Sequence, residues 1–145
     1  MWSQQLLIEQ LTDELRLITR GGPNPMRLAT LPTLRALSRV DGSLKIAQVG
    51  SLMSTYLQDG IGTLGPVEVE GNPVSAEDAK LCVRLLLRYK GRWMSLPERR
   101  YRVLSILGSP FPIEQMRRPH SPERELLRAL AAHLVAEAEV SQITS

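Results

Sequence analysis

The segment from Lys80 to Lys90 constrains the fold more than any other, because it is apolar on almost every side of a helix. At about 100° per residue, its cations Lys80, Arg84 and Arg88 fall within an arc of about 80°. Leucine, valine, cysteine and tyrosine occupy nearly all of the remaining circumference. A helix this apolar is stable only when other helices surround it. We therefore expect it at the centre of a helical bundle, with one basic ridge reaching the solvent.

Three segments in the second half of the chain carry clear signals for the start of a helix. Ser75, Ser95 and Ser121 are each followed within three residues by glutamate, and prolines lie close after the second and third serine. These are helix-capping patterns, and proline is favoured in the first turn of a helix. They predict helices that end near Lys90, Leu107 and Val140.

The first half of the chain shows apolar residues at helical spacing in three further segments, 3–19, 32–40 and 44–57. Glycines and prolines between the first two predict a flexible joint. The glycines within 58–65 predict a loop. The alternating Val-Glu-Val-Glu sequence at 67–70 predicts a short extended piece.

The expected fold is therefore all-α. We expect residues 1–145 to form a single helical domain, a bundle of five or six helices, whose least regular part is the Gly/Pro-rich connection at about 60–74. Six aromatic side chains in 145 residues also favour packed helices over a β-sandwich.

Charge is distributed very unevenly along the chain. The 23 residues from Lys80 to Arg102 contain eight cations and one acid, Glu98, so they carry +7. The net charge of +3 for the whole chain leaves −4 for the other 122 residues. This asymmetry indicates a negatively charged partner. The residues predicted to contact it are Arg84, Arg88, Lys90, Arg92, Trp93, Arg99, Arg100 and Arg102.

Aromatic residues alternate with cations in this stretch. On nucleic acid, such a surface would pair cations with phosphates while a ring stacks on a base. In the alternative interpretation, Tyr89 and Tyr101 point into the core and the cations only keep the helix faces solvated. The sequence leaves both open.

A helix, a glycine turn and a second helix within 34–57 have the outline of a DNA-binding helix-turn-helix. Asp41 stands where an apolar residue is required, and Lys45 is the single cation available to the second helix. Reading of DNA sequence by this pair is therefore disfavoured.

No residue pattern predicts catalysis. His133 and Glu137 are four residues apart, but a metal site needs more ligands. Cys82 lies in an apolar run that denies a nucleophile access to substrate. The glycines at 60–65 lack the lysine of a phosphate-binding loop. We expect no enzymatic activity, no metal, no cofactor and no small-molecule substrate.

The predicted function is a non-catalytic helical interaction module, an adaptor or complex subunit. Its Arg-rich face would dock an acidic protein surface, or the acidic N-terminal helix of a second copy in self-association. The alternative is a small helical subunit that binds nucleic-acid backbone without sequence specificity. A single cysteine and the lack of a signal peptide or long apolar segment predict a cytoplasmic protein that does not insert into membranes.

Overall fold

The computed structural model describes residues 3–108, 114, 116, 118 and 120–144, and for residues 141–144 the backbone alone. In order along the chain, its elements are α1 (Gln4–Gly21), α2 (Pro25–Leu28), α3 (Pro32–Ser38), α4 (Ile46–Gly62), β1 (Val67–Val69), β2 (Asn72–Val74), α5 (Ala76–Leu86), α6 (Leu96–Leu107) and α7 (Pro122–Thr144). The predicted all-α class is confirmed.

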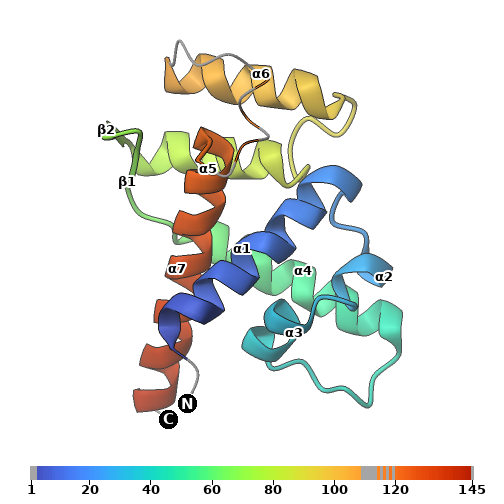
Figure 1. The fold of residues 1–145 in the computed structure, drawn as a ribbon. Coiled ribbons are helices and arrows are strands. Elements are labelled where there is room, and N and C mark those ends of the chain that lie inside the picture. Colours follow the sequence, from blue (N-terminus) through green and yellow to red (C-terminus); the bar gives the residue numbers. More distant parts are fainter. Residues whose placement is uncertain (1–2, 109–113, 115, 117, 119, 145) are drawn as a thin grey trace.

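The helices are stacked in layers (Figure 1). Helix α6 lies across the top and packs on α5. Helices α1 and α7 pack on each other in the middle, and α4 occupies the lower right together with α2 and α3. Helix α5 is buried as predicted, with Cys82, Val83 and Leu86 fully inaccessible. Helix α7, however, contacts α1, α3, α4, α5 and β1, and it therefore joins more of the fold than α5 does.

One helix extends into a segment that was expected to be a loop, and another forms where no helix was expected. Helix α4 continues to Gly62, and its Gly60 lies against Leu134 of α7, where a Cβ atom would overlap the leucine side chain. Helix α2 begins where the expected flexible joint ends, with Asn24 as its cap and Pro25 in its first turn. It packs against Gly50 of α4, where a Cβ atom would collide with the Pro25 carbonyl. These glycines serve close helix packing rather than chain reversal.

Helix α5 ends at Leu86, four residues earlier than expected. The amides of Tyr89 and Lys90 both donate to the Arg84 carbonyl, at 2.8 and 3.1 Å. Arg88 adopts a left-handed conformation with φ of 65°. The chain thus leaves the helix through a compact turn.

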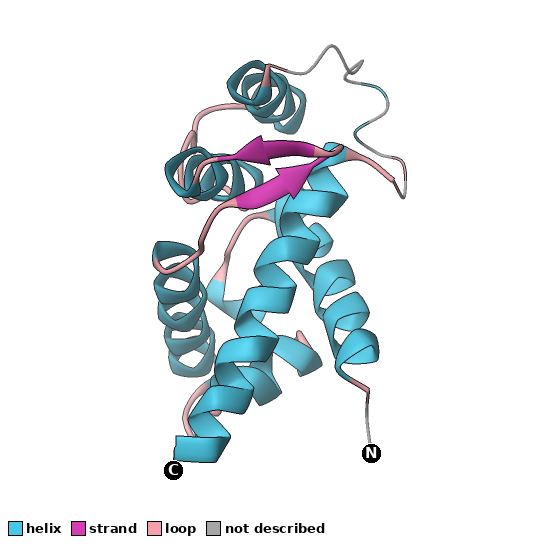
Figure 2. Cartoon of the chain, turned by 90° about the vertical axis from the view of Figure 1, so that its left-hand side faces the viewer, coloured by secondary structure: helices cyan, strands magenta, loops and turns pink. Residues whose placement is uncertain are grey.

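The predicted extended piece forms one strand of a hairpin. Val67 pairs with Val74 and Val69 with Asn72 in an antiparallel ladder. Glu70 and Gly71 at the turn both have positive φ, as a tight hairpin requires. Figure 2 shows the hairpin beside the upper end of α7, and the Glu125 carboxylate there accepts the Glu70 amide at 3.1 Å.

Glu14 of α1 caps α3 from a distance in sequence. Its carboxylate accepts the backbone amides of Thr33 and Leu34, each at 2.9 Å, and Leu31 at the cap position offers no side-chain acceptor. The glutamate is 8% exposed. It therefore fixes the position of α3 against α1 by satisfying amides that a helix start leaves unpaired.

In the part of the chain that the structure describes, no helix is both long and apolar enough to cross a membrane.

Candidate functional site

Two of the arginines predicted to face a partner point into the protein. Arg99 is 2% exposed and Arg100 is 5% exposed. They lie on the stripe of α6 that also carries the buried Val103 and Leu104, at the i, i+4 spacing of one helix face. The expectation that Arg99 and Arg100 lie on the surface is wrong. The apolar stripe was the sequence signal that would have placed them inside.

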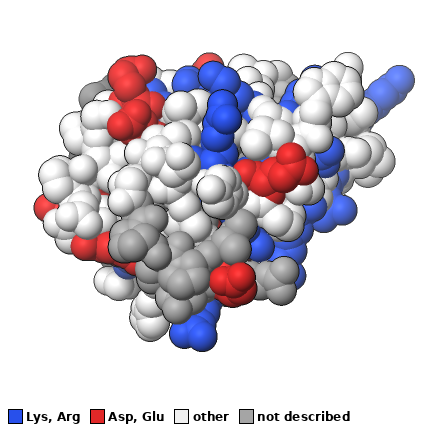
Figure 3. All heavy atoms as spheres, turned by 90° about the horizontal axis from the view of Figure 1, so that it is seen from above, with Lys and Arg blue, Asp and Glu red and all other residues white. Residues whose placement is uncertain are grey.

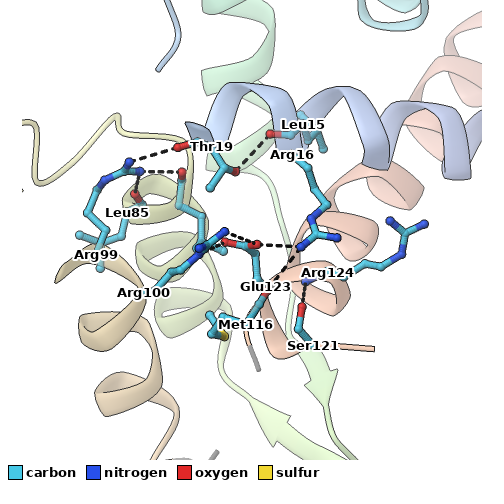
Figure 4. Close-up of polar contacts among 11 residues, drawn as sticks. Leu15, Arg16, Thr19, Leu85, Arg99, Arg100, Met116, Ser121, Glu123 and Arg124 are labelled. Atoms are coloured by element: carbon cyan, nitrogen blue, oxygen red, sulfur yellow. Dashed lines mark hydrogen bonds and ion pairs between the residues drawn. The ribbon is translucent and has the colours of Figure 1, made fainter. Parts of the chain in front are cut away.

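Arg99 binds backbone carbonyls at the ends of two helices (Figure 4). Its guanidinium donates to Leu85 and Leu86 of α5, at 3.0 and 2.9 Å, and to Thr19 of α1 at 3.1 Å. Carbonyls at a helix C-terminus lack partners within the helix and carry partial negative charge. Burial lowers the pKa of this guanidinium, and the nearby charges of Arg88 and Arg100 act in the same direction. Arg99 is thus a structural clamp between α1, α5 and α6.

Arg100 forms a buried ion pair with Glu123 at the start of α7. Its Nε and Nη2 atoms lie 2.8 and 3.1 Å from the two carboxylate oxygens. Arg16 of α1 reaches the same carboxylate at 3.2 Å. The Glu123 side chain is 1% exposed. One glutamate therefore ties α1, α6 and α7 together, and the sequence analysis did not single it out.

The remaining predicted cations stay near the surface. Arg88, Lys90, Arg92 and Arg102 are exposed and Arg84 is partly buried. Among the described residues, none of these five forms an ion pair with a carboxylate. In the view from above, positive side chains follow much of the right-hand edge of the molecule (Figure 3), with acidic groups scattered elsewhere and one close to this edge.

Two aromatic side chains lie fully or largely in solvent beside these cations. Trp93 is 99% exposed and Tyr101 is 70% exposed. Tyr89 behaves differently, because it is partly buried and its hydroxyl lies 2.8 Å from the Ser54 hydroxyl. The alternative interpretation placed both Tyr89 and Tyr101 in the core. Tyr89 packs against the core, whereas Tyr101 is exposed. We call the exposed set the cationic–aromatic face, comprising Arg88, Lys90, Arg92, Trp93, Tyr101 and Arg102.

The segment that carries Trp93 is held by its own hydrogen bonds. The Met94 amide donates to the Gly91 carbonyl at 2.9 Å, and the Arg88 guanidinium donates to the Arg92 carbonyl at 3.2 Å. Gly91 has φ of 70°, and the Met94 sulfur would lie 2.9 Å from any Cβ atom there. The turn is therefore fixed in a shape that leaves the indole without a neighbour.

Helix α6 begins directly after this turn. Ser95 and Glu98 form the expected capping box, in which the Ser95 hydroxyl accepts the Glu98 amide at 3.3 Å and Glu98 accepts the Ser95 amide at 3.3 Å. A hollow of about 460 Å³ follows along the outer side of the helix. It is lined by Met94, Pro97, Glu98, Tyr101, Arg102 and Ser105.

The arginines of α7 do not extend this face. Arg124 binds Glu9 at 2.6 Å and Asp13 at 3.0 Å, and Arg128 binds Glu9 at 2.8 Å. The hydrogen bond from Arg128 is the main cause that lowers the pKa of Glu9. These side chains instead tie α1 to α7.

The other chemical candidates do not form sites. The His133 Nε2 atom lies 3.2 Å from Glu137 and 2.8 Å from the Thr63 hydroxyl, but the described residues contain no group of three potential metal ligands. Cys82 is inaccessible, and burial raises its pKa to about 12. A thiol in that state is not an activated nucleophile.

The helix pair within 34–57, for which DNA reading was disfavoured, packs its second helix, α4, against the core through one side. Helix α4 turns Val49, Met53 and Leu57 into the core, and Ser54 on its side is engaged by Tyr89.

No family model, no curated protein and no solved structure matches this chain. Its function is therefore inferred from its own surface.

Proposed function

We propose that this protein is a non-catalytic interaction module that docks an acidic protein surface through the cationic–aromatic face. The observation that carries the proposal is Trp93, which is 99% exposed on a turn fixed by its own hydrogen bonds. A large aromatic ring kept in water contributes nothing to folding, whereas burial against a partner removes its apolar surface from solvent.

The composition of the face supports this role. Tryptophan, tyrosine and arginine are the residues most enriched among those that dominate binding energy at protein interfaces. Trp93, Tyr101 and Arg92 or Arg102 supply all three as exposed side chains of the α5–α6 region. Because the turn is already ordered, little conformational entropy is lost when a partner binds.

Charge specifies the kind of partner. Lys90, Arg92 and Arg102 are exposed without ion pairs among the described residues, and Glu98 is the single acid in the same stretch. An acidic surface would be attracted in solution and oriented by these cations. A basic partner would be repelled by the same charges.

Nucleic-acid backbone binding is the second candidate, and one observation favours it. The two exposed rings stand among cations, which is the arrangement that stacks bases and holds phosphates in single-strand binding proteins. Four exposed cations would give a log–log salt slope of about −3 on single strands.

The first experiment compares two double charge reversals in affinity isolation from cells. Arg92→Glu with Arg102→Glu changes the face, and Arg39→Glu with Lys45→Glu makes the same change in net charge at exposed positions elsewhere. We expect an acidic protein to co-isolate with the wild type and with the second variant and to be lost from the first. Retention of that protein by the first variant would refute the assigned face.

A second experiment separates the two candidates. Labelled single- and double-stranded 20-nucleotide probes are titrated with the wild type at about 50 mM salt, where screening is still moderate. The protein-docking proposal predicts no binding of either probe. Saturable binding with a slope near −3, abolished in Trp93→Ala, would instead support the nucleic-acid candidate.

A further inference from the structure

An open apolar groove lies between α1 and α3, far from the cationic–aromatic face. Its volume is about 780 Å³. The lining residues are Leu7, Gln10, Asp13, Glu14, Pro32, Thr33, Ala36 and Leu37. Most of this surface is aliphatic, and no described side chain of the same molecule fills it.

The groove has one exposed acid, Asp13, whose charge is opposite to that of the turn that carries Trp93. Glu14 is 8% exposed and its carboxylate accepts the Thr33 and Leu34 amides, so it is not available to a partner. Two of its lining residues, Asp13 and Glu14, are acids and none is a lysine or arginine. Asp13 pairs with Arg124 through one oxygen at 3.0 Å, yet its side chain remains 71% exposed. The turn from Arg88 to Met94 contains three cations and no acid.

The groove and the turn are complementary in both shape and charge. The turn offers an uncovered indole flanked by Lys90 and Arg92, and the groove offers an uncovered apolar surface with Asp13 at its side. In Figures 1 and 2, the α5–α6 connection lies near the top of the molecule, whereas α3 and the N-terminal half of α1 lie in its lower part. A single molecule therefore cannot bring its own turn to its own groove.

We propose that Trp93 of one copy inserts into the α1–α3 groove of a second copy of this chain, with Lys90 and Arg92 beside Asp13. The inference rests on the proposed function, since it uses the same face and identifies the docked surface as the groove beside Asp13 on a second copy of this chain. In the proposed association each copy gives its turn to one neighbour and its groove to another, which is a head-to-tail arrangement. Such contacts produce chains, or rings where the rotation closes, rather than a dimer limited to two copies.

The test is sedimentation equilibrium of the full chain over a wide concentration range, using two variants that each damage one surface. Trp93→Ala removes the inserted side chain and keeps the groove. Ala36→Arg places a long cation at the exposed position 36 in the groove and keeps the turn. For the wild type we expect the average mass to rise with concentration beyond two copies of 16.2 kDa.

Each variant alone should stay monomeric, with an association constant at least about 30-fold below that of the wild type. An equimolar mixture should form a one-to-one heterodimer, because one variant supplies an intact groove and the other an intact turn. That heterodimer cannot grow, since its two outer surfaces are damaged. A reciprocal two-fold dimer, in which each copy inserts its turn into the groove of the other, would instead stop at two copies in the wild type.

Three results would overturn the inference. They are a wild type that remains monomeric at millimolar concentration, a Trp93→Ala variant that associates like the wild type, and a mixture that stays monomeric while the wild type associates. The proposed function is separable from all three. When one of those results has overturned self-association, the docking face is still supported if a different acidic protein binds the wild type and Ala36→Arg equally and does not bind the double variant Arg92→Glu with Arg102→Glu.

Discussion

Removing the charge of Glu123 should destabilise the protein more than any other single loss of charge described above. Its carboxylate is 1% exposed and receives Arg100 at 2.8 and 3.1 Å and Arg16 at 3.2 Å. In Glu123→Gln the Arg100 guanidinium stays buried, at 7% side-chain exposure, with no counter-charge. Breaking a buried pair on one side costs about 3–5 kcal/mol.

That cost is large relative to the total stability of roughly 5–15 kcal/mol expected for a domain. At about 3 °C per kcal/mol for a chain of this size, the melting temperature should fall by on the order of 10 °C. Most of the loss should come from the uncompensated arginine rather than from the missing contact itself.

The assay is urea unfolding followed by far-UV circular dichroism, with Glu139→Gln as the matched control. Glu139 is an exposed glutamate on the same helix, so its replacement should change stability by less than about 0.5 kcal/mol. A further variant, Arg100→Met with Glu123→Leu, replaces the pair by apolar side chains. It should recover much of the loss, because an apolar pair of similar volume is often as stable as a buried ion pair.

A Glu123→Gln protein as stable as its control would refute the buried network. The buried network would also be refuted if the double variant lost as much stability as Arg100→Met and Glu123→Leu lose separately, because the effects of replacing two partners of one ion pair on stability are not additive.

Three further predictions concern the packing of the helices. Glu14→Ala should lower stability by about 1–2 kcal/mol, measured in urea, because the first amides of α3 lose their acceptor; an unchanged midpoint would contradict the capping role. Gly50→Ala should cost about 1–3 kcal/mol by overpacking, measured by thermal melting, because a Cβ atom would collide with the Pro25 carbonyl; equal stability would show that α2 packs differently. Cys82, whose pKa is raised to about 12 by burial, should resist iodoacetamide at pH 8 in the folded protein and react in urea, whereas rapid native labelling would contradict its burial.

Local signals predicted the main helices well. The capping serines at 75 and 95 lie directly before helices that begin at Ala76 and Leu96, and the apolar stripe of α5 is buried as expected. These features succeed because capping and periodicity depend on neighbours within one or two turns.

Features that depend on distant residues were not predictable in the same way. Gly60 resembles a loop residue in sequence, but it lies within α4 and packs against Leu134 of another helix. The apolar stripe of α6 indicated that Arg99 and Arg100 point inward, but their partners, carbonyls of α5 and the Glu123 carboxylate of α7, are distant in sequence and could not be predicted. Summing charge along the chain therefore overestimated the basic face, and two of its eight predicted residues became part of the core.

Site-specific photo-crosslinking tests most directly whether Trp93 lies at the centre of a binding face. A photoreactive phenylalanine analogue replaces Trp93 in one protein and Leu52, an exposed apolar residue of α4, in a control, and both are irradiated in cells. The account predicts a discrete crosslinked protein product at position 93 that disappears when Arg92→Glu and Arg102→Glu are added, and none at position 52. No product at position 93, or a product that survives the charge reversal, would contradict it.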